Sequence, residues 1–395
     1  MDPASLPKRL AGSAGRLLAD AVSGPQVAKA VSDLDARWTQ HRHDRKLEDG
    51  TLREVRVLVH RGWVARGVAK VHVRVVEEPR LPEAASSLPY WDVFTANLRR
   101  HVALSFPDVT VRARIGPAEA KATTDRRGFA ALSLDVGDLH PGWHRVDVAT
   151  VPAATDGPVF RGSGNVLSAE PDAPLLVVSD IDDTVLRTGM TEGLTALRRT
   201  LLREDHSRRA VPGMASLYRG LARGVRSADG KRPAEVPCFY VSSGSWALYE
   251  MLTLFLQIRG FPEGPIFLSD WGPTDRYVYR SGEEHKTQAI GRLLSAYPDT
   301  PVLLIGDSGQ QDPEIYCDIA SGTPDRIVAV LIIRTGDKSD SRIVELRGRI
   351  RQMRQRGVKL LVADDAAEAA RLMLELRLCE PEVVDAVRAE MRARF

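Results

Sequence analysis

The feature that most constrains the fold of this chain is a change in its apolar pattern near residue 175. From Leu175 onward, short uninterrupted apolar runs recur, in the stretches LLVVS, CFYVS, PIFLS, VLLIG, IVAVLII and KLLVA. Segments with helical spacing separate most of these runs. Uninterrupted runs are typical of strands buried on both faces, so they predict a parallel sheet covered by helices. We expect a doubly wound α/β fold over residues 170–375 and a C-terminal helix over residues 376–395.

The preceding part of the chain has a different period. From Glu54, apolar and polar residues alternate in short runs that are broken by Gly, Pro and Asp. Alternation predicts half-buried strands, and we expect a small all-β sandwich over residues 51–165. The stretch ATTDRRGFAALSLDV, residues 122–136, resembles the turn-and-strand signature of transthyretin-like or immunoglobulin-like accessory sandwiches. We expect residues 88–106 to form a helix or loop, and residues 154–174 to form a loop into the α/β domain.

Residues 1–50 are expected to form an N-terminal helical segment. Five apolar residues recur there at roughly helical spacing: Leu6, Leu10, Leu17, Leu18 and Val22. Two interpretations stay open, a helix on a membrane surface and a helix docked on its own domain, and the second is the more common arrangement. The segment lacks an apolar stretch long enough for a secretory signal.

Composition limits the classes of protein that fit. The 55 Lys and Arg residues against 52 Asp and Glu residues give a net charge of +3, which argues against a general nucleic-acid binder. The three cysteines are widely spaced and odd in number, so neither a disulfide framework nor a zinc site is predicted. A cytoplasmic protein fits this cysteine pattern, and peripheral attachment to the inner membrane surface remains open.

An acidic run follows the first apolar stretch. The segment from Asp180 through Asp182 and Asp183 to Thr184 comes directly after LLVVS. Ligands of open parallel sheets bind beyond the carboxyl ends of the strands, which is where this run is expected to lie. Crowded carboxylates repel one another, and a hard divalent cation with oxygen ligands, usually Mg²⁺ where phosphate is also bound, resolves the repulsion. The alternative is a turn and helix cap, because Asp is common there.

Other strand ends carry further polar residues. Ser242 and Ser243 follow CFYVS, Lys286 opens an expected helix in EEHKTQAIGRLL, and GDSGQQD contains Asp307 and Asp312. The ordered set is similar to the pattern of the haloacid dehalogenase-type (HAD) phosphotransferase superfamily, hhhhDxDx[TV], then hhhh[ST], then Lys, then hhhhGDxxxxD.

This resemblance implies a role for each matching residue. Asp180 would attack phosphorus and form an aspartyl phosphate, while Asp182 would act as general acid and base. Lys286 would neutralise charge on the nucleophile and the phosphate. Ser242 would bind the phosphate, with Ser243 as its competitor after a one-residue shift, and Thr184 would steady the loop and contact phosphate. Mg²⁺ would be held by four aspartates: Asp180, Asp182, Asp307 and Asp312.

A narrower resemblance indicates the substrate. The stretches DIDDTVLRTG, FYVSSGSWALYEMLTLFL and EHKTQAIGRLLSAYPDTPVLLIGDSGQQDPEIY resemble the App1-type phosphatidate phosphatase family, a lipin-related branch, over about residues 170–335. The resemblance implies Mg²⁺-dependent hydrolysis of phosphatidic acid to diacylglycerol and phosphate. The intervals between motifs, about 60 and about 45 residues, leave no room for a full cap domain. An open site of this kind suits a large or surface-embedded substrate.

Two other functions remain as alternatives. One is a HAD-type phosphomonoesterase that acts on a soluble or polymeric phosphate ester. The other is a binding protein with a vestigial site, which predicts the loss of a motif residue, and the sequence retains them all. Beside the motifs, Arg187, Thr188 and Trp246 are candidates to contact substrate, against the alternatives of a surface arginine and a core tryptophan.

Overall fold

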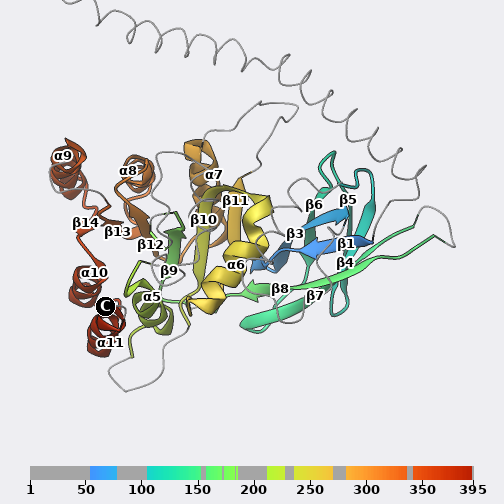
Figure 1. Cartoon of the computed structure of the whole chain (residues 1–395), viewed down its shortest axis with the longest axis horizontal. Coiled ribbons are helices and arrows are strands. Elements are labelled where there is room, and N and C mark those ends of the chain that lie inside the picture. Colours follow the sequence, from blue (N-terminus) through green and yellow to red (C-terminus); the bar gives the residue numbers. More distant parts are fainter. Residues whose placement is uncertain are drawn as a thin grey trace, which may run out of the picture.

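The structure is a computed structural model that describes nine ranges of the chain: 54–77, 105–152, 157–170, 173–182, 184–185, 211–226, 235–269, 282–335 and 341–393. It contains an eight-stranded sheet in the N-terminal part and a six-stranded sheet in the C-terminal part (Figure 1). The predicted N-terminal helical segment lies outside the described residues, as does most of the segment 88–106. Asp183, Arg187 and Thr188 lie outside them too.

The N-terminal sheet is mixed. Its strands are β1 Val55–Val59, β2 Gly62–Ala65, β3 Val68–Glu77, β4 Thr110–Ile115, β5 Ala118–Thr123, β6 Phe129–Asp135, β7 Gly142–Thr150 and β8 Arg161–Ser168. The strand order is β1-β3-β2-β8-β7-β4-β5, and β6 pairs with the other edge of β3. All these pairs are antiparallel except β2 with β8. Burial alternates along the strands, as in β6, so one side chain in two enters the core, as the two-residue period predicts.

Strand β8 corrects one expectation, because residues 154–174 were predicted to be a loop. Glycine and polar residues give this segment the composition of a loop. In the fold the glycines are required by close packing: a Cβ on Gly162 would lie 2.2 Å from the carbonyl oxygen of Val57, and one on Gly164 would lie 2.7 Å from a Val59 methyl group. Glycine here marks a strand that another backbone approaches closely.

The second sheet confirms the predicted α/β domain with a parallel sheet. Its strands are β9 Leu176–Asp180, β10 Cys238–Ser245, β11 Ile266–Ser269, β12 Val302–Asp307, β13 Ile327–Ile333 and β14 Leu360–Ala363. Each coincides with one of the six apolar runs, with its start shifted by at most one residue, and every pair is parallel. The order is β11-β10-β9-β12-β13-β14. From β9 the chain adds β10 and β11 on one side and then β12, β13 and β14 on the other, so the order of the strands reverses between β9 and β12. Such a reversal point is where open α/β sheets bind ligands.

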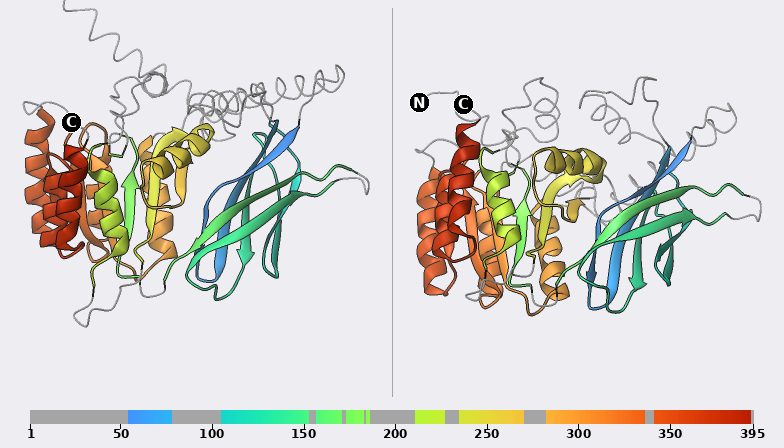
Figure 2. Two further views of the ribbon diagram at one scale, coloured as in Figure 1. Left: turned by 60° about the horizontal axis from the view of Figure 1, so that its bottom comes forward. Right: turned by 90° about the horizontal axis from the view of Figure 1, so that it is seen from below.

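Helices cover both faces of this sheet (Figure 2). They are α5 Met214–Arg223, the short 3₁₀ helix η4 Trp246–Leu248, α6 Tyr249–Ile258, α7 Gly282–Ala296, α8 Asp312–Gly322, α9 Ser341–Gln355, α10 Ala366–Glu375 and α11 Pro381–Arg392. Val177 of β9 belongs to the hydrophobic cluster that contains residues of α5, α6, α10 and α11, whereas its neighbours Leu176 and Val178 belong to the cluster with residues of α7, α8 and α9. Burial of successive residues on opposite faces explains the uninterrupted apolar runs. No helix among the described residues combines the length and the apolar character needed to cross a membrane.

The two sheets meet along the β10–β11 side of the parallel sheet. Trp63 of β2 packs on Phe267 of β11, with ring centroids 4.8 Å apart. The hydroxyl group of Tyr297, just after α7, donates a hydrogen bond to the carbonyl oxygen of Val64 (2.8 Å). The indole of Trp246 stacks on the His60 ring at 4.5 Å. Trp246, a candidate substrate contact, therefore packs between the two sheets.

Candidate active site

The candidate site lies at the carboxyl ends of β9 and β12, the two central strands at the reversal point. Asp180 is the last residue of β9 and Asp307 is the last residue of β12. The parallel register pairs Ser179 with Ile305, which brings the two strand ends side by side. The two carboxylates that the resemblance assigns to one metal ion therefore lie at the same edge of the sheet.

Asp312, the first residue of α8, completes a cluster of three buried carboxylates with Asp180 and Asp307. One oxygen from each carboxylate lies within 4.8 Å of the others, and all three residues are 0% exposed. The backbone N–H of Asp307 donates a hydrogen bond to Oδ2 of Asp312 (3.3 Å). Gly306 makes room for this approach, because a Cβ there would lie 2.5 Å from the same oxygen.

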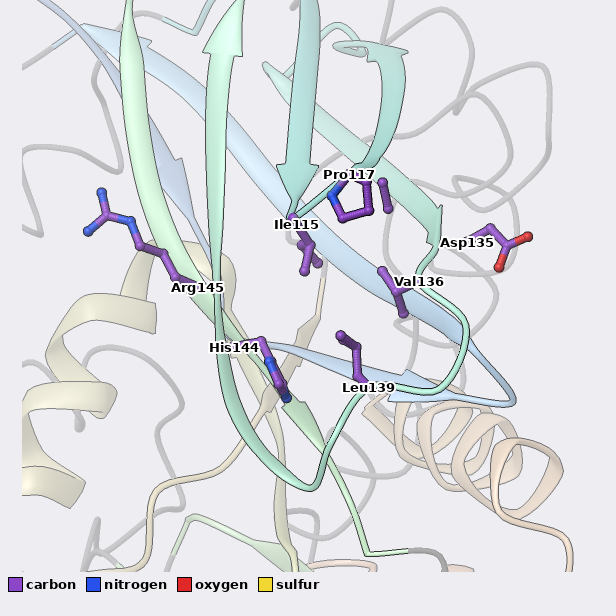
Figure 3. A pocket seen from close by; sticks show the side chains of 9 residues that line it. Ile115, Pro117, Asp135, Val136, Leu139, His144 and Arg145 are labelled. Atoms are coloured by element: carbon purple, nitrogen blue, oxygen red, sulfur yellow. The ribbon is translucent and has the colours of Figure 1, made fainter.

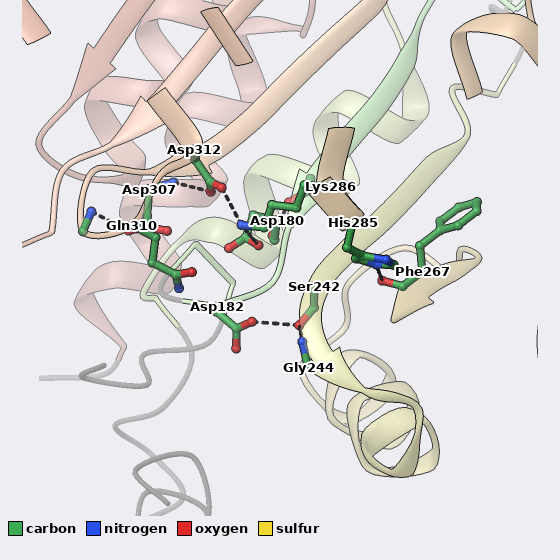
Figure 4. A network of polar contacts seen from close by, with 12 residues as sticks. Asp180, Asp182, Ser242, Gly244, Phe267, His285, Lys286, Asp307, Gln310 and Asp312 are labelled. Atoms are coloured by element: carbon green, nitrogen blue, oxygen red, sulfur yellow. Dashed lines mark hydrogen bonds and ion pairs between the residues drawn. The ribbon is translucent and has the colours of Figure 1, made fainter. Parts of the chain in front are cut away.

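Lys286, from the first turns of α7, is the buried cation of the cluster. Its side chain is 2% exposed, its Nζ lies 2.7 Å from Oδ1 of Asp180, and it also forms an ion pair with Asp312. Burial disfavours the ammonium ion and lowers its pKa, but the attraction of the two carboxylates is larger, so the pKa of Lys286 is raised. The side chain therefore stays charged and fixed between two acidic groups (Figure 4).

The cluster is short of positive charge. Burial raises the pKa of Asp180 well above its usual value, and Asp312, Asp182 and Asp307 raise it further against the attraction of Lys286. Among the residues that the structure describes, Oδ2 of Asp180 has no hydrogen-bond partner. Together with the carboxylates of Asp307 and Asp312, this unpartnered oxygen makes a set of oxygen ligands that suits a hard divalent cation. The residues present thus fit a metal ion that prefers oxygen ligands, such as Mg²⁺.

A second pair of predicted residues meets beside the cluster. The hydroxyl group of Ser242 donates a hydrogen bond to Oδ2 of Asp182 (2.7 Å) and accepts one from the backbone N–H of Gly244 (2.9 Å) (Figure 4). Ser243, the competitor for the same role, has its hydroxyl group beside the start of α7, where a Cβ on Gly282 would lie 2.6 Å from Ser243 Oγ. The geometry thus brings Ser242 to Asp182.

Thr184 lies fully buried next to the acidic run. Its hydroxyl group has no hydrogen-bond partner among the described residues. An unpartnered buried hydroxyl group costs free energy unless a ligand or water completes it.

Sequence reasoning missed the residues that hold Asp307. Oδ1 of Asp307 accepts hydrogen bonds from the backbone N–H groups of Gly309 (2.5 Å) and Gln310 (3.1 Å) and from the hydroxyl group of Thr335 (3.4 Å). Thr335 follows β13, so the rule that directed attention to the carboxyl ends of strands could have found it. The turn after β12 holds Asp307 through backbone N–H groups, and a pattern of side chains in the sequence does not predict such bonds.

A hollow of about 450 Å³ lies elsewhere, at one end of the N-terminal sheet (Figure 3). Its apolar lining includes Ile115, Val136 and Leu139, and His144 and Arg145 stand beside them. None of its lining residues comes from the parallel sheet, so it is separate from the acidic cluster.

The candidate site lies in the part of the chain that is similar to known proteins. Residues 175–335 match the family model described as the catalytic domain of phosphatidate phosphatase APP1. Over 157 residues, 40% of this chain, the sequence is 31% identical to phosphatidate phosphatase APP1 of Saccharomyces cerevisiae. Over the same length it is 25% identical to an uncharacterized protein of Schizosaccharomyces pombe. The matches cover 25% and 24% of those two proteins, so the chain spans about a quarter of the length of each.

Solved structures give only a faint likeness. A carbohydrate acetylesterase from Xanthomonas citri is 12% identical, with 74% of this chain and 69% of that chain covered, at a TM-score of 0.25. A likeness this low carries no argument about the chain. The sequence match is of a different kind, because every residue of the candidate site lies inside the matched range. Residues 175–335, which contain the whole candidate site, are thus similar to the catalytic domain of phosphatidate phosphatase APP1.

Proposed function

We propose that this protein is a Mg²⁺-dependent phosphatidate phosphatase, which hydrolyses phosphatidic acid to diacylglycerol and phosphate through an aspartyl-phosphate intermediate. The observation that carries the proposal is the buried cluster of Asp180, Lys286, Asp307 and Asp312, with the Asp182–Ser242 pair beside it. The cluster combines a candidate nucleophile, a fixed cation and a donor set for a divalent metal. The family match over the same residues supports the substrate.

Finer assignments of fold belong to the same proposal. The strand order and the four ordered motifs support a HAD-like, Rossmann-like domain over residues 170–375 with a minimal cap. The N-terminal strands are proposed to be a β-sandwich accessory domain within residues 51–165, and residues 376–395 a C-terminal helical segment. Helix α11, within this C-terminal segment, packs beside α5 and α10 on one face of the parallel sheet.

Mg²⁺ would be held by carboxylate oxygens of Asp180 and Asp307, with the carbonyl group of Asp182 as a further ligand. Asp312 would support the site from its bonds to Lys286 and the Asp307 backbone. When bound, the ion supplies positive charge that stabilises the phosphoryl group in the transition state. Lys286 supplies a permanent charge on the other side of the Asp180 carboxylate.

In the first step, an oxygen of the Asp180 carboxylate bonds to phosphorus as the bond from phosphorus to the diacylglycerol oxygen breaks. The Asp182 carboxyl group gives its proton to the departing oxygen, so diacylglycerol leaves neutral and Asp182 becomes a carboxylate. Ser242 and Thr184 would exchange their present arrangement for hydrogen bonds to phosphoryl oxygens. The Ser242 hydroxyl group already donates a hydrogen bond to a carboxylate oxygen of Asp182, so a phosphoryl oxygen could take the place of that acceptor.

In the second step, the Asp182 carboxylate takes a proton from water as the water oxygen bonds to phosphorus. The bond between phosphorus and Asp180 breaks, which releases phosphate and restores the Asp180 carboxylate. Asp182 ends the cycle protonated, as it began. One carboxylate thus serves as nucleophile and its neighbour two residues away moves the proton.

A substrate panel tests this function. Release of phosphate is measured from phosphatidate in detergent micelles and, at matched concentrations, from glycerol phosphate, a sugar phosphate and a phosphorylated oligonucleotide end. Each is assayed with Mg²⁺ and with a chelator. We expect Mg²⁺-dependent turnover that is fastest on phosphatidate. Faster turnover of a soluble or polymeric ester would replace the lipid assignment by the phosphomonoesterase alternative, and turnover unaffected by the chelator would contradict the metal.

A further inference from the structure

One face of α9 carries a stripe of arginines. Arg347, Arg351 and Arg354 recur at the spacing of one helical face, and all three are exposed. Val344, one turn before Arg347 on the same face, is 70% exposed. Leu346 and Met353 lie on the opposite, buried face. We call these four exposed residues, Val344, Arg347, Arg351 and Arg354, the α9 stripe.

The acidic groups that the structure describes near α9 pair with an arginine outside the α9 stripe. None of its three arginines forms an ion pair with another residue in the part of the chain that the structure describes. Two carboxylates on or beside α9, those of Glu345 and Glu314, pair instead with Arg349 at 3.3 Å and 3.6 Å. The chain as a whole carries a net charge of only +3, so three arginines without an ion pair to any described residue, on two turns of helix, are a local concentration of charge.

The topology fixes which end of the α9 stripe lies near the active site. Helix α9 connects β13 to its parallel neighbour β14, so it begins at the carboxyl edge of the sheet and ends at the amino edge. Asp307 lies at that carboxyl edge, paired with Ile333, the last residue of β13. Val344 is therefore the member nearest the edge that carries the site, and Arg354 lies about 15 Å farther along the helix. Figure 1 shows α9 at the end of the molecule away from the N-terminal sheet.

We propose that the α9 stripe docks the protein on an anionic lipid surface, with the first turns of α9 toward the bilayer. Val344 enters the interfacial region, and Arg347 and Arg351 contact lipid phosphates. The inference rests on the proposed function, because this orientation turns the carboxyl edge of the parallel sheet toward a substrate held in the membrane. Electrostatic attraction fades within a Debye length of about 8–10 Å, so the contribution of each arginine falls from Arg347 to Arg354.

Vesicle sedimentation of the full chain tests the proposal without any turnover. The vesicles contain phosphatidylcholine alone or with about a third phosphatidylglycerol, a lipid that carries no phosphomonoester. We expect binding to the anionic vesicles that weakens with salt. The double variant Arg347→Gln/Arg351→Gln removes two charges, each worth about a factor of five near the surface, and should lower the partition coefficient roughly 30-fold at low salt. Val344→Ser should lower it severalfold.

The chain offers a matched control on the far side of α9. Arg356 and Lys359 are exposed just before β14, at the amino edge of the sheet. Arg356→Gln/Lys359→Gln makes the same change in net charge, and we expect the partition coefficient to stay within about twofold of the wild type. Equal losses in the two double variants, or wild-type binding by Arg347→Gln/Arg351→Gln, would overturn the proposal. So would binding of duplex DNA in preference to the anionic vesicles.

The outcome is independent of the substrate panel. Phosphatidylglycerol vesicles report docking even if the enzyme hydrolyses another ester. Vesicle binding by the stripe with no phosphatidate turnover would leave the docking surface in place and remove the proposed substrate. Turnover of micellar phosphatidate, with vesicle binding that does not depend on the α9 stripe, would keep the proposed substrate and remove the docking surface.

Discussion

At the scale of single residues, Asp180 is the side chain with the least favourable surroundings in the candidate site. It is completely buried and has three other carboxylates around it, Asp182, Asp307 and Asp312. Lys286 offsets part of this repulsion from 2.7 Å. Such an arrangement costs stability in the metal-free protein and suits a site that binds a cation and then a phosphate.

Asp180→Asn separates the two consequences of this arrangement. The amide keeps the shape of the side chain but cannot attack phosphorus, so turnover should fall by at least about a thousandfold. Because one buried charge is removed while Lys286 keeps Asp312 as a partner, the melting temperature without metal should be equal to or above that of the wild type. Mg²⁺ should raise the melting temperature of the wild type more than that of the variant. Thermal melts with and without Mg²⁺ measure this difference.

The exposed Asp318 of α8 provides the control for this variant. Asp318→Asn makes the same chemical change outside the cluster and should leave turnover and the effect of Mg²⁺ unchanged. Retained turnover by Asp180→Asn would remove Asp180 as the nucleophile. A large loss of stability in the metal-free variant would show instead that the carboxylate is a structural partner of Lys286.

At the scale of secondary-structure elements, the turn between β12 and α8 sets the position of Asp312. Gly306 of β12 lies directly beneath the Asp312 side chain, and a Cβ there would also lie 2.7 Å from the ring of Tyr316. Both neighbours are fully buried, so neither can move freely. The glycine in this strand end is needed for the close approach of a helix side chain to the backbone.

Gly306→Ala should therefore disturb the cluster without removing any of its charges. The added methyl group must displace Asp312 or Tyr316, and overpacking of this kind costs about 1–3 kcal/mol. We expect Mg²⁺ to bind at least tenfold more weakly, as measured by titration calorimetry, together with a lower unfolding free energy in urea. Gly291→Ala on α7 is the matched control, because a Cβ there meets nothing within 4 Å. Wild-type Mg²⁺ affinity in Gly306→Ala would contradict this role of Gly306.

The elements also show how far the sequence predicts the structure. Uninterrupted apolar runs predicted the six strands of the parallel sheet, because burial on both faces leaves no other composition. The rule that ligands bind beyond the carboxyl ends of strands directed attention to Asp180 and Asp307, whereas the pairing of their two strands came from the structure. Strand β8 was missed because its glycines are selected by packing against β1 and give the segment the composition of a loop. The backbone bonds that hold Asp307, and the bond from Thr335, depend on folded geometry rather than on a motif.

At the scale of the whole molecule, two histidines lie where the sheets meet. His60 stacks on Trp246, and His72 of β3 lies 5.8 Å from the same indole. Burial, aided by the positive charge of Arg292, lowers the pKa of His72 to about 4. Burial also lowers the pKa of His60 well below its usual value, with His72 and Arg74 adding to the effect. Both rings are neutral in the folded protein near neutral pH.

The contact between the sheets should therefore weaken in acid. The unfolded chain takes up a proton on His72 near pH 6.5, whereas the folded protein resists protonation until about pH 4. The contribution of the neutral ring to stability is complete above pH 6.5 and is lost as the pH falls through 4. His72→Gln removes this titration, so the difference in unfolding free energy between neutral and acid pH should shrink by about 1–3 kcal/mol. Urea unfolding at both pH values measures it.

The exposed His140 serves as the control for the pH experiment. His140→Gln should leave the pH dependence of stability as it is in the wild type. An identical pH dependence in His72→Gln and the wild type would mean that the meeting of the two sheets does not depend on a neutral His72.

The central claim is that Asp180 carries the phosphoryl group between the two steps of hydrolysis. The most direct measurement is rapid acid quenching of the wild-type protein during turnover of phosphatidate that is labelled in its phosphate, followed by peptide mapping. We expect label on the peptide that contains Asp180, loss of this label when unlabelled substrate is added, and no label in Asp180→Asn. Turnover of phosphatidate with no label on that peptide, or with label on another side chain, would contradict it.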